Sequence, residues 1–444
     1  MSRRTRARRL TFAVADQDVI IENRISTVSF KECFIVACVS RFVTLGLIML
    51  SDALIPDHDP GEDVRTFGGD GTKNSILNSF TRWDAAHYLN IAKNGYVTEQ
   101  SFVFLPVYPY TIHFLAQIMK YFVGNRLAED TLLIICGLIV SNVCFILSVL
   151  ILRALCEVHY MTPDRKRCCI YLFCFNPASV FFSTIYSESM YCLFTLCGIL
   201  YYETKLFLRS AFWFLLASGV RANGWMNIIP LAAKISMDVM EGRRKKRKNL
   251  IFILLPLTVV LIPFLLWNRV VPAAICSLKD ISPRMIDWCT VNHQQNQSTT
   301  SHFSFIYGKL QEVHWDVGFL RQYQIRQIPN FLLALPTVVC ASIYTHKAFP
   351  IPIFTYGSDR DIFFKVHSLH LLGILGLVLL FAHVQIITRV VYSSCPIIYY
   401  HIAESMAQCL SWNENQPFCD YCLLYFSSYF VLGIVLHSNF YPWT

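Results

Sequence analysis

The sequence predicts an all-α polytopic membrane protein with roughly nine to eleven transmembrane helices and large lumenal loops. Composition is the first reason: 55% of the residues are hydrophobic and 15% are charged, whereas about a quarter of the residues of a soluble domain are charged. The second reason is that long apolar runs recur along the chain, each able to cross about 30 Å of hydrocarbon. The third is that basic clusters lie beside such runs, which is typical of cytoplasmic flanks rather than of nucleic-acid binding.

The expected spans begin after a basic N-terminal segment. Residues 1–32 carry "SRRTRARRL" and are predicted to be cytosolic. The first apolar run begins too far into the chain for a typical cleaved signal peptide, so we expect it to remain as a membrane anchor. Residues 33–444 then form a single multispan membrane domain. Two shorter or interrupted runs, 102–122 and 390–403, supplement the long runs at 33–51, 131–153, 170–186, 189–206, 211–235, 249–268, 329–346, 366–388 and 421–438.

A cytosolic N-terminus assigns two large loops to the lumen. The first is 52–101 and the second is 269–328. The second loop contains the sequon that begins at Asn296, which makes Asn296 a candidate acceptor of an N-linked glycan. The same loop contains Cys276 and Cys289, which are candidates for a disulfide.

The basic cluster "GRRKKRK" at 242–248 constrains the path of the chain, because it should face the cytosol. If every apolar run from 131 to 235 crossed the membrane fully, this cluster would face the lumen. We therefore expect "SGVRANG" at 218–224 to break its helix into a re-entrant pair that lines a cavity or packs against protein. The alternative is that 102–122 also spans the membrane.

A compact polar stretch, "SFTRWDAAHY" at 79–88, follows the first apolar run. In a helix Trp83, Asp84 and His87 can share one face, because residues three and four apart are neighbours. At the lumenal membrane surface Asp84 suits a general base for a sugar hydroxyl, with burial raising its pKa. The alternative is that Asp84 pairs with Arg82 or His87 and only holds the loop together.

A second acidic motif, "IPDHD" at 55–59, comes directly off the first predicted span. Asp57 and His58 therefore lie near the place where a membrane-facing site is expected. Together with Asp59 they offer metal ligands, but carboxylates beside a single His are common by chance, so no metal is predicted. The 17 cysteines show no zinc-site spacing either.

Two ionisable residues among the apolar runs are expected to meet. Glu188 lies between two runs, where an acid is costly unless it faces a cavity or a partner. Glu188 and Arg221 are therefore expected to pair, either as a structural ion pair or as a contact to substrate. Arg221 with Asn223 suits a phosphate group, and the alternative is a snorkelling Arg near a helix end.

Three further arginines are candidates for lipid or substrate binding. Arg321 and Arg326 lie at a membrane boundary, where they either hold an anionic headgroup or flank a span. Arg389 lies among apolar residues with His383 and Gln385, which indicates a polar cavity. We find no P-loop, dinucleotide fingerprint or G-x-S-x-G elbow, so no soluble nucleotide cofactor is expected.

In order along nearly the whole chain, these stretches resemble the PIG-V family of the GT-C glycosyltransferases. No single motif is specific, whereas the ordered set is. The acidic insertion "DPGED" makes the alignment of the first loop uncertain just after Asp57, and Arg82 and Ala86 lie at positions expected to vary. The matching stretches are "IPDH" at 55–58, "RWDAAHYLNIAKNGY" at 82–96, "FVFLPVYP" at 102–109, "FNPASVFFSTIYSES", "GVRANG", "WDVGFLRQYQIRQIPNFLLALP", "TRVVYSSCPIIYY" at 388–400 and "HSNFYPWT".

The resemblance implies a GT-C-like, multi-pass enzyme of the endoplasmic reticulum membrane. It implies transfer of the second, α1,6-linked mannose from dolichyl phosphate mannose to a glycosylphosphatidylinositol (GPI) precursor, by inversion and without a further cofactor. Asp84 matches the family's Trp-Asp-x-x-His motif and Asp57 its Ile-Pro-Asp-His, so either carboxylate is the expected base. A small accessory membrane subunit would be a further partner. The residues expected to bind substrate are Trp83, His87, His58, Glu188, Arg221, Asn223, Arg321, Arg326 and Arg389.

Three rival interpretations fit the same bulk properties. A lipid or solute transporter would explain charged residues within spans, but transporters usually contain a repeated half, and none is visible. A non-catalytic assembly subunit would use Trp83, Asp84 and His87 only to secure a loop, which substitution of Asp84 tests. Another transferase that uses a dolichyl-phosphate sugar is the nearest alternative in chemistry.

Overall fold

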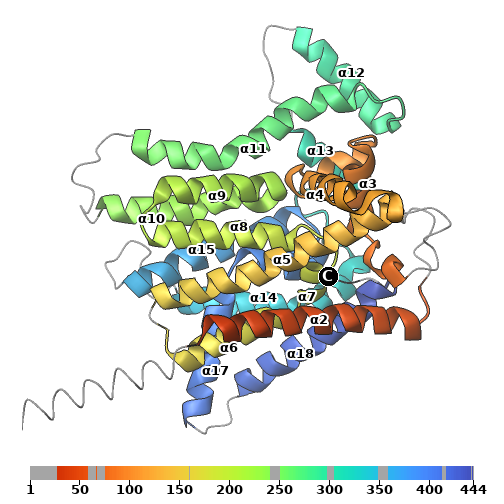
Figure 1. Cartoon of the computed structure of the whole chain (residues 1–444). Coiled ribbons are helices and arrows are strands. Elements are labelled where there is room, and N and C mark those ends of the chain that lie inside the picture. Colours follow the sequence, from red (N-terminus) through yellow and green to blue (C-terminus); the bar gives the residue numbers. More distant parts are fainter. Residues whose placement is uncertain are drawn as a thin grey trace, which may run out of the picture.

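The computed structural model describes residues 28–58, 67, 76–159, 161–240, 251–297, 305–348, 359–412, 417–441 and 443. Within these ranges the protein is all-α, and no strand is found. Long helices lie roughly parallel in one bundle, while α3, α4, α12 and α13 gather toward one end of it (Figure 1). The helices are α2 (Phe30–Leu54), α3 (Asp84–Asn94), α4 (Val107–Val123), α5 (Glu129–Val158), α6 (Pro163–Cys174), α7 (Ser179–Ser183), α8 (Glu188–Glu203), α9 (Phe207–Val220), α10 (Ile228–Met240), α11 (Ile251–Ile275), α12 (Pro283–Gln297), α13 (Ile306–Trp315), α14 (Ile328–Ala348), α15 (Asp359–Phe381), α16 (Ile387–Ser394), α17 (Ile397–Trp412) and α18 (Pro417–Ser438), with 3-10 turns η1 (Ile76–Phe80), η2 (Glu99–Val103), η3 (Gly124–Arg126), η4 (Ala222–Asn227), η5 (Ile325–Gln327) and η6 (Val384–Ile386).

Six helices of the described chain are long and apolar enough to cross a membrane, so the expected nine to eleven spans are not confirmed. Several predicted runs are divided into helices shorter than the about 20 residues that a span needs. The run 170–186 is interrupted after α6, where the Asn176 side chain donates to the Phe173 carbonyl at 2.7 Å and accepts from the Ala178 amide at 2.8 Å. The six spans lie in α2, α5, α11, α14, α15 and α18.

The predicted break at 218–224 is present. Helix α9 ends at Val220, and Arg221 has an extended backbone with φ −140° and ψ 143° before η4 begins. The backbone of η4 folds back on α9 so closely that a Cβ at Gly224 would lie 2.6 Å from the Ala217 carbonyl oxygen. This close approach requires glycine, and it presents Arg221 at the end of the bundle. That the two helices form a re-entrant pair stays a prediction.

The boundaries of the predicted domain and loops shift by a few residues. Helix α2 begins at Phe30, before the predicted residue 33, because Ser29 accepts a hydrogen bond from the Glu32 amide at 3.0 Å as an N-cap. Helix α11 continues into the second predicted loop, which also contains α12 and α13. The disulfide for which Cys276 and Cys289 were candidates is present, and it joins the end of α11 to α12. The sequon's Asn296 lies in α12, while its third residue lies outside the described ranges.

A buried arginine fixes the turn that leads to α8. Arg41 of α2 is 2% exposed, and its guanidinium donates to the Cys174 carbonyl at 2.7 Å and to the Ser183 hydroxyl at 2.8 Å. It also lies over the Phe145 ring at 3.6 Å. Since these contacts hold the end of α6 and α7 against α2, they set the position from which α8 begins.

Candidate active site

The site is built around the start of α3. Helix α3 begins at Asp84, and Trp83 before it has φ 57° and ψ −131°. A positive φ is uncommon outside glycine, and such strain gathers at functional sites. The Trp83 ring is held by the end of α18, since its Nε1 donates to the His437 carbonyl at 3.4 Å and it lies 5.8 Å from the Phe440 ring. Asp84 and His87 share a helical face as predicted, but the prediction that Trp83 lies on that helix is wrong.

Asp84 pairs with Arg389, which α16 contributes from 305 positions further along the chain. Arg389 Nη1 lies 2.6 Å from Asp84 Oδ2, and the two side chains are 18% and 31% exposed. Burial by itself raises the pKa of Asp84, but the adjacent guanidinium outweighs burial and holds that pKa below its usual range. The expectation that the pKa of Asp84 is raised is therefore wrong, and Asp84 is held as a carboxylate.

A second carboxylate brings two guanidinium groups together. Glu188 is the first residue of α8 and its side chain is fully buried. Its Oε1 lies 2.5 Å from Arg221 Nη1 and 3.8 Å from Arg389 Nη1. The predicted pairing of Glu188 with Arg221 is confirmed, and a helix N-terminus is a favourable place for the negative charge. We call Asp84, Glu188, Arg221 and Arg389 the Asp84 cluster.

Hydrogen bonds orient Arg221 within the cluster. Its Nη1 donates to the Ser187 hydroxyl at 3.1 Å, which the Tyr88 hydroxyl also contacts at 2.7 Å. Its Nε donates to Asn223 Oδ1 at 3.3 Å, and Asn223 in turn donates to Ser394 Oγ at 3.1 Å. The sequence reasoning missed Tyr88, Ser187 and Ser394. Tyr88 was detectable, because it lies four residues after Asp84 in a predicted helix.

Asp57 and His58 belong to a neighbouring network. Arg82 is 3% exposed and its Nη1 lies 2.6 Å from Asp57 Oδ1. It also pairs with Asp52 and donates to the Ser438 carbonyl. Of the alternative that Asp84 pairs with Arg82 or His87, the pairing with Arg82 is therefore wrong. His58 likewise faces the segment after α18, with its amide 2.9 Å from the Asn439 carbonyl and its ring stacked 5.1 Å from that of Tyr441.

The structure does not bring Arg321 and Arg326 into contact with the Asp84 cluster. Arg321 pairs with Glu312 at 3.0 Å and with Asp316 at 3.4 Å, while Arg326 lies 3.9 Å from Asp316. Both arginine side chains are exposed, at 44% and 71%. Both arginines precede the start of α14. This position fits the alternative that they flank a span rather than bind substrate.

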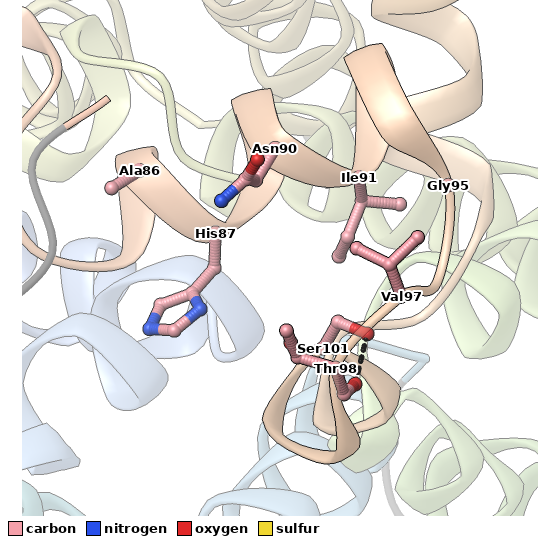
Figure 2. Close-up of a pocket in the computed structure, with 8 residues that line it drawn as sticks. All are labelled: Ala86, His87, Asn90, Ile91, Gly95, Val97, Thr98 and Ser101. Carbon is pink, nitrogen blue, oxygen red and sulfur yellow. Dashed lines mark hydrogen bonds between the residues drawn. The ribbon is translucent and has the colours of Figure 1, made fainter. Parts of the chain in front are cut away.

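A small pocket lies between α3, after Asp84, and the segment that follows this helix (Figure 2). The His87 ring lies at its edge and stacks 4.9 Å from the Phe104 ring. The opposite wall includes Thr98 and Ser101, whose hydroxyl donates to the Thr98 carbonyl. The pocket has room for about one water molecule, which its amide, imidazole and hydroxyl groups can hydrogen-bond. The lining residues are Ala86, His87, Asn90, Ile91, Gly95, Val97, Thr98 and Ser101.

Within the described ranges no group of three or more His, Cys, Asp or Glu side chains is arranged to hold a metal ion. The chemistry available is that of two carboxylates and two guanidinium groups, with a small pocket on α3 nearby. Together these groups can accept a proton from a hydroxyl and bind a phosphate.

Comparison with known proteins identifies related sequences. The model of the family described as mannosyltransferase (PIG-V) matches residues 30–444. The chain is 27% identical to rat GPI alpha-1,6-mannosyltransferase 2, over 93% of this chain and 97% of the relative. It is 26% identical to the human protein of the same name, over 93% and 97%. It is 25% identical to GPI mannosyltransferase 2 of Drosophila melanogaster, over 92% and 98%.

Proposed function

The chain belongs to the mannosyltransferase (PIG-V) family, and on this premise we propose that it adds the second, α1,6-linked mannose to a GPI precursor. The donor is dolichyl phosphate mannose, and the reaction takes place on the lumenal side of the endoplasmic reticulum membrane. The names of the relatives in rat and human support the acceptor and the linkage. Six apolar helices suit two substrates that are both anchored in lipid.

Asp84 is the base of the proposed reaction. Its carboxylate accepts the proton of the acceptor mannose 6-hydroxyl, and the oxygen attacks the anomeric carbon of the donor. The bond from that carbon to the phosphate oxygen breaks, and its electron pair leaves with dolichyl phosphate. Because a β-linked donor gives an α-linked product, one displacement with inversion suffices and needs a single base.

Arg389 and Arg221 stabilise the leaving phosphate. Both guanidinium groups lie beside Glu188, at 2.5 Å for Arg221 and 3.8 Å for Arg389, and positive groups already in place favour negative charge that develops in the transition state. Dolichyl phosphate is a good leaving group as an anion, so no protein acid is required.

Asp84 is preferred to Asp57 because of their partners. Asp57 is 49% exposed and pairs with Arg82, which also holds the end of α18. Asp84 faces the arginine that is shared with Glu188. The Asp84 cluster is the observation on which the proposed function depends.

The lumenal location is supported by the disulfide between Cys276 and Cys289. Disulfides persist in oxidising compartments such as the lumen of the endoplasmic reticulum and are rare in the cytosol. The disulfide joins α11 to α12, at the end of the bundle where α3 and α13 also lie (Figure 1).

A rescue experiment tests the function and the base together. Cells that lack the second GPI mannosyltransferase receive the wild type, Asp84→Asn, Asp57→Asn or, as a matched control, Asp164→Asn, whose carboxylate is 85% exposed. We expect surface GPI proteins to return with the wild type and the control. Asp84→Asn should lower transfer by about 10²–10⁴-fold at equal protein level.

Two results would count against the proposal. Failure of well-expressed wild type to consume the one-mannose precursor would indicate another transferase. Near-normal transfer by Asp84→Asn, with loss in Asp57→Asn, would move the base to Asp57.

A further inference from the structure

Arg389 contacts the proposed base Asp84 and is also one of the groups proposed to bind the phosphate. Most N–H groups of its guanidinium are not used within the part of the protein that the structure describes. Among the described residues, Nη1 is the one atom of its guanidinium with a hydrogen-bond partner, and that partner is Asp84. The same Nη1 lies 3.8 Å from the buried Glu188. Nη2 and Nε therefore remain as donors on a side chain that is 18% exposed.

The members of the Asp84 cluster differ in exposure. Glu188 is fully buried, whereas the side chains of Asp84, Arg389 and Arg221 are 31%, 18% and 13% exposed. Guanidinium binds phosphate through the same kind of N–H donors as it binds carboxylate. A phosphate at Nη2 and Nε of Arg389 therefore draws the guanidinium toward itself and away from Asp84.

We propose that the donor's phosphate takes Arg389 from Asp84, so that Asp84 becomes an effective base only when the donor is bound. This inference rests on the proposed function. Before the donor binds, the ion pair holds Asp84 as a weak base. Once Arg389 turns to the phosphate, the partial burial of Asp84 acts against a weaker opposing charge, and the proton affinity of Asp84 rises.

The exchange on donor binding also prepares the site for the charge of the reaction. The acceptor O–H bond breaks and its proton goes to Asp84, which becomes neutral. At the same time the anomeric C–O bond breaks and its electron pair adds a negative charge to the phosphate. Arg389, which has already turned to the phosphate, stabilises this added charge. Such an exchange also keeps Asp84 from activating water while the donor is absent.

Several other titratable groups interact with Asp84 and must be separated from it. His87 lies on the same helix, and Arg221 follows α9. Tyr186 precedes α8, His437 lies on α18 and Tyr307 lies on α13. Of these, His87 is the one outside the spans whose ordinary pKa falls near neutral pH.

The test is the pH dependence of transfer by the full-length enzyme in lipid nanodiscs, with donor varied at saturating acceptor. The acid limb of kcat/KM for the donor reports the enzyme before the donor binds, and that of kcat reports the complex. We expect the limb of kcat to lie about one pH unit or more above that of kcat/KM. Coincident limbs in the wild type would overturn the inference while leaving the proposed function intact. Absence of any transfer would overturn both.

Two variants identify the groups involved. In Arg389→Gln the acid limbs of kcat/KM and of kcat should coincide, at the pH where the limb of kcat lies in the wild type. The variant should also have a kcat that is lower by about 10²–10³-fold. Exposed Arg209 on α9 supplies the matched control, Arg209→Gln, which should behave as the wild type. His87→Asn should keep the separation of the limbs, whatever its rate. If the separation disappears in His87→Asn, the titrating group is His87 and the inference is wrong. Since the comparison of limbs needs only the wild type, misfolding of Arg389→Gln does not block the test.

Discussion

Arg82 and Asp84 are two positions apart, yet they serve different networks. The side chain of Arg82 faces Asp52, Asp57 and the end of α18, while that of Asp84 faces Arg389. The unusual backbone of Trp83 between them turns the chain from one network to the other. The strained residue therefore joins the part of the site that holds the fold to the part that reacts.

Substitution of Arg82 should affect stability more than chemistry. Arg82→Gln removes the partner of two carboxylates and the donor to Ser438, so we expect the free energy of unfolding to fall by about 2 kcal/mol or more. Thermal unfolding of the purified protein in detergent measures this loss. Transfer per folded molecule should stay within a few-fold of the wild type. A loss of turnover without a loss of stability would instead place Arg82 among the reacting groups.

At the scale of elements, η4 depends on how closely it approaches α9. Gly224→Ala places a methyl group 2.6 Å from the Ala217 carbonyl oxygen and from the Ser218 Cα. Because both are backbone atoms, η4 must move, and Arg221 and Asn223 move with it. We expect transfer to fall at least tenfold, by the cost of misplacing a binding group.

Gly376 of α15 provides the matched control for this substitution. A Cβ there meets no atom within 4 Å, so Gly376→Ala should leave transfer unchanged and slightly favour the helix. Initial rates at saturating donor measure both variants. Equal rates for Gly224→Ala and Gly376→Ala would mean that the position of η4 is not critical.

At the scale of the whole molecule, the segment that runs from the end of α11 through α13 should face the lumen. We expect Asn296 to carry a glycan, so that endoglycosidase treatment of the protein increases its gel mobility and Asn296→Gln removes the change. In intact microsomes Cys276 and Cys289 should resist thiol reagents until they are reduced, because they form a disulfide. Immediate labelling of both cysteines by a cytosolic reagent would reverse the proposed orientation.

The sequence predicted the local features of this molecule well. The break before η4, the helix that starts near Asp84 and the pairing of Glu188 with Arg221 all follow from signals within a few residues or from the cost of an unpaired charge in a membrane. Cys276 and Cys289 were candidates for a disulfide because they lie in one predicted lumenal loop, and the structure shows the bond. In each case the deciding interaction is short in sequence or has few possible partners.

Long-range partners were beyond such reasoning. Asp84 meets Arg389 across 305 positions, and Arg82 meets Ser438 across 356. Several arginines were equally plausible partners, because the hydrophobic pattern does not specify which ends of which helices adjoin. The number of spans is not confirmed for a related reason: at Asn176 hydrogen bonds of the side chain interrupt a run whose hydropathy is continuous. The direction of the pKa shift of Asp84 was wrong for the same reason. The sequence indicated that Asp84 is partly buried, but it did not indicate that Arg389 lies beside it.

The distance in sequence between Asp84 and Arg389 has a consequence for biosynthesis. At about 5–20 residues per second, a ribosome needs about 15 s to 1 min to translate the 305 positions between them. During that interval Asp84 has already been made, while the guanidinium that pairs with it does not yet exist. A nascent chain released before α16 would keep Asp84 without Arg389 at the membrane surface, although Glu188 would still have Arg221. We expect such incomplete chains to be retained by membrane chaperones and degraded, so that translation to α16 sets the earliest time at which the enzyme can mature.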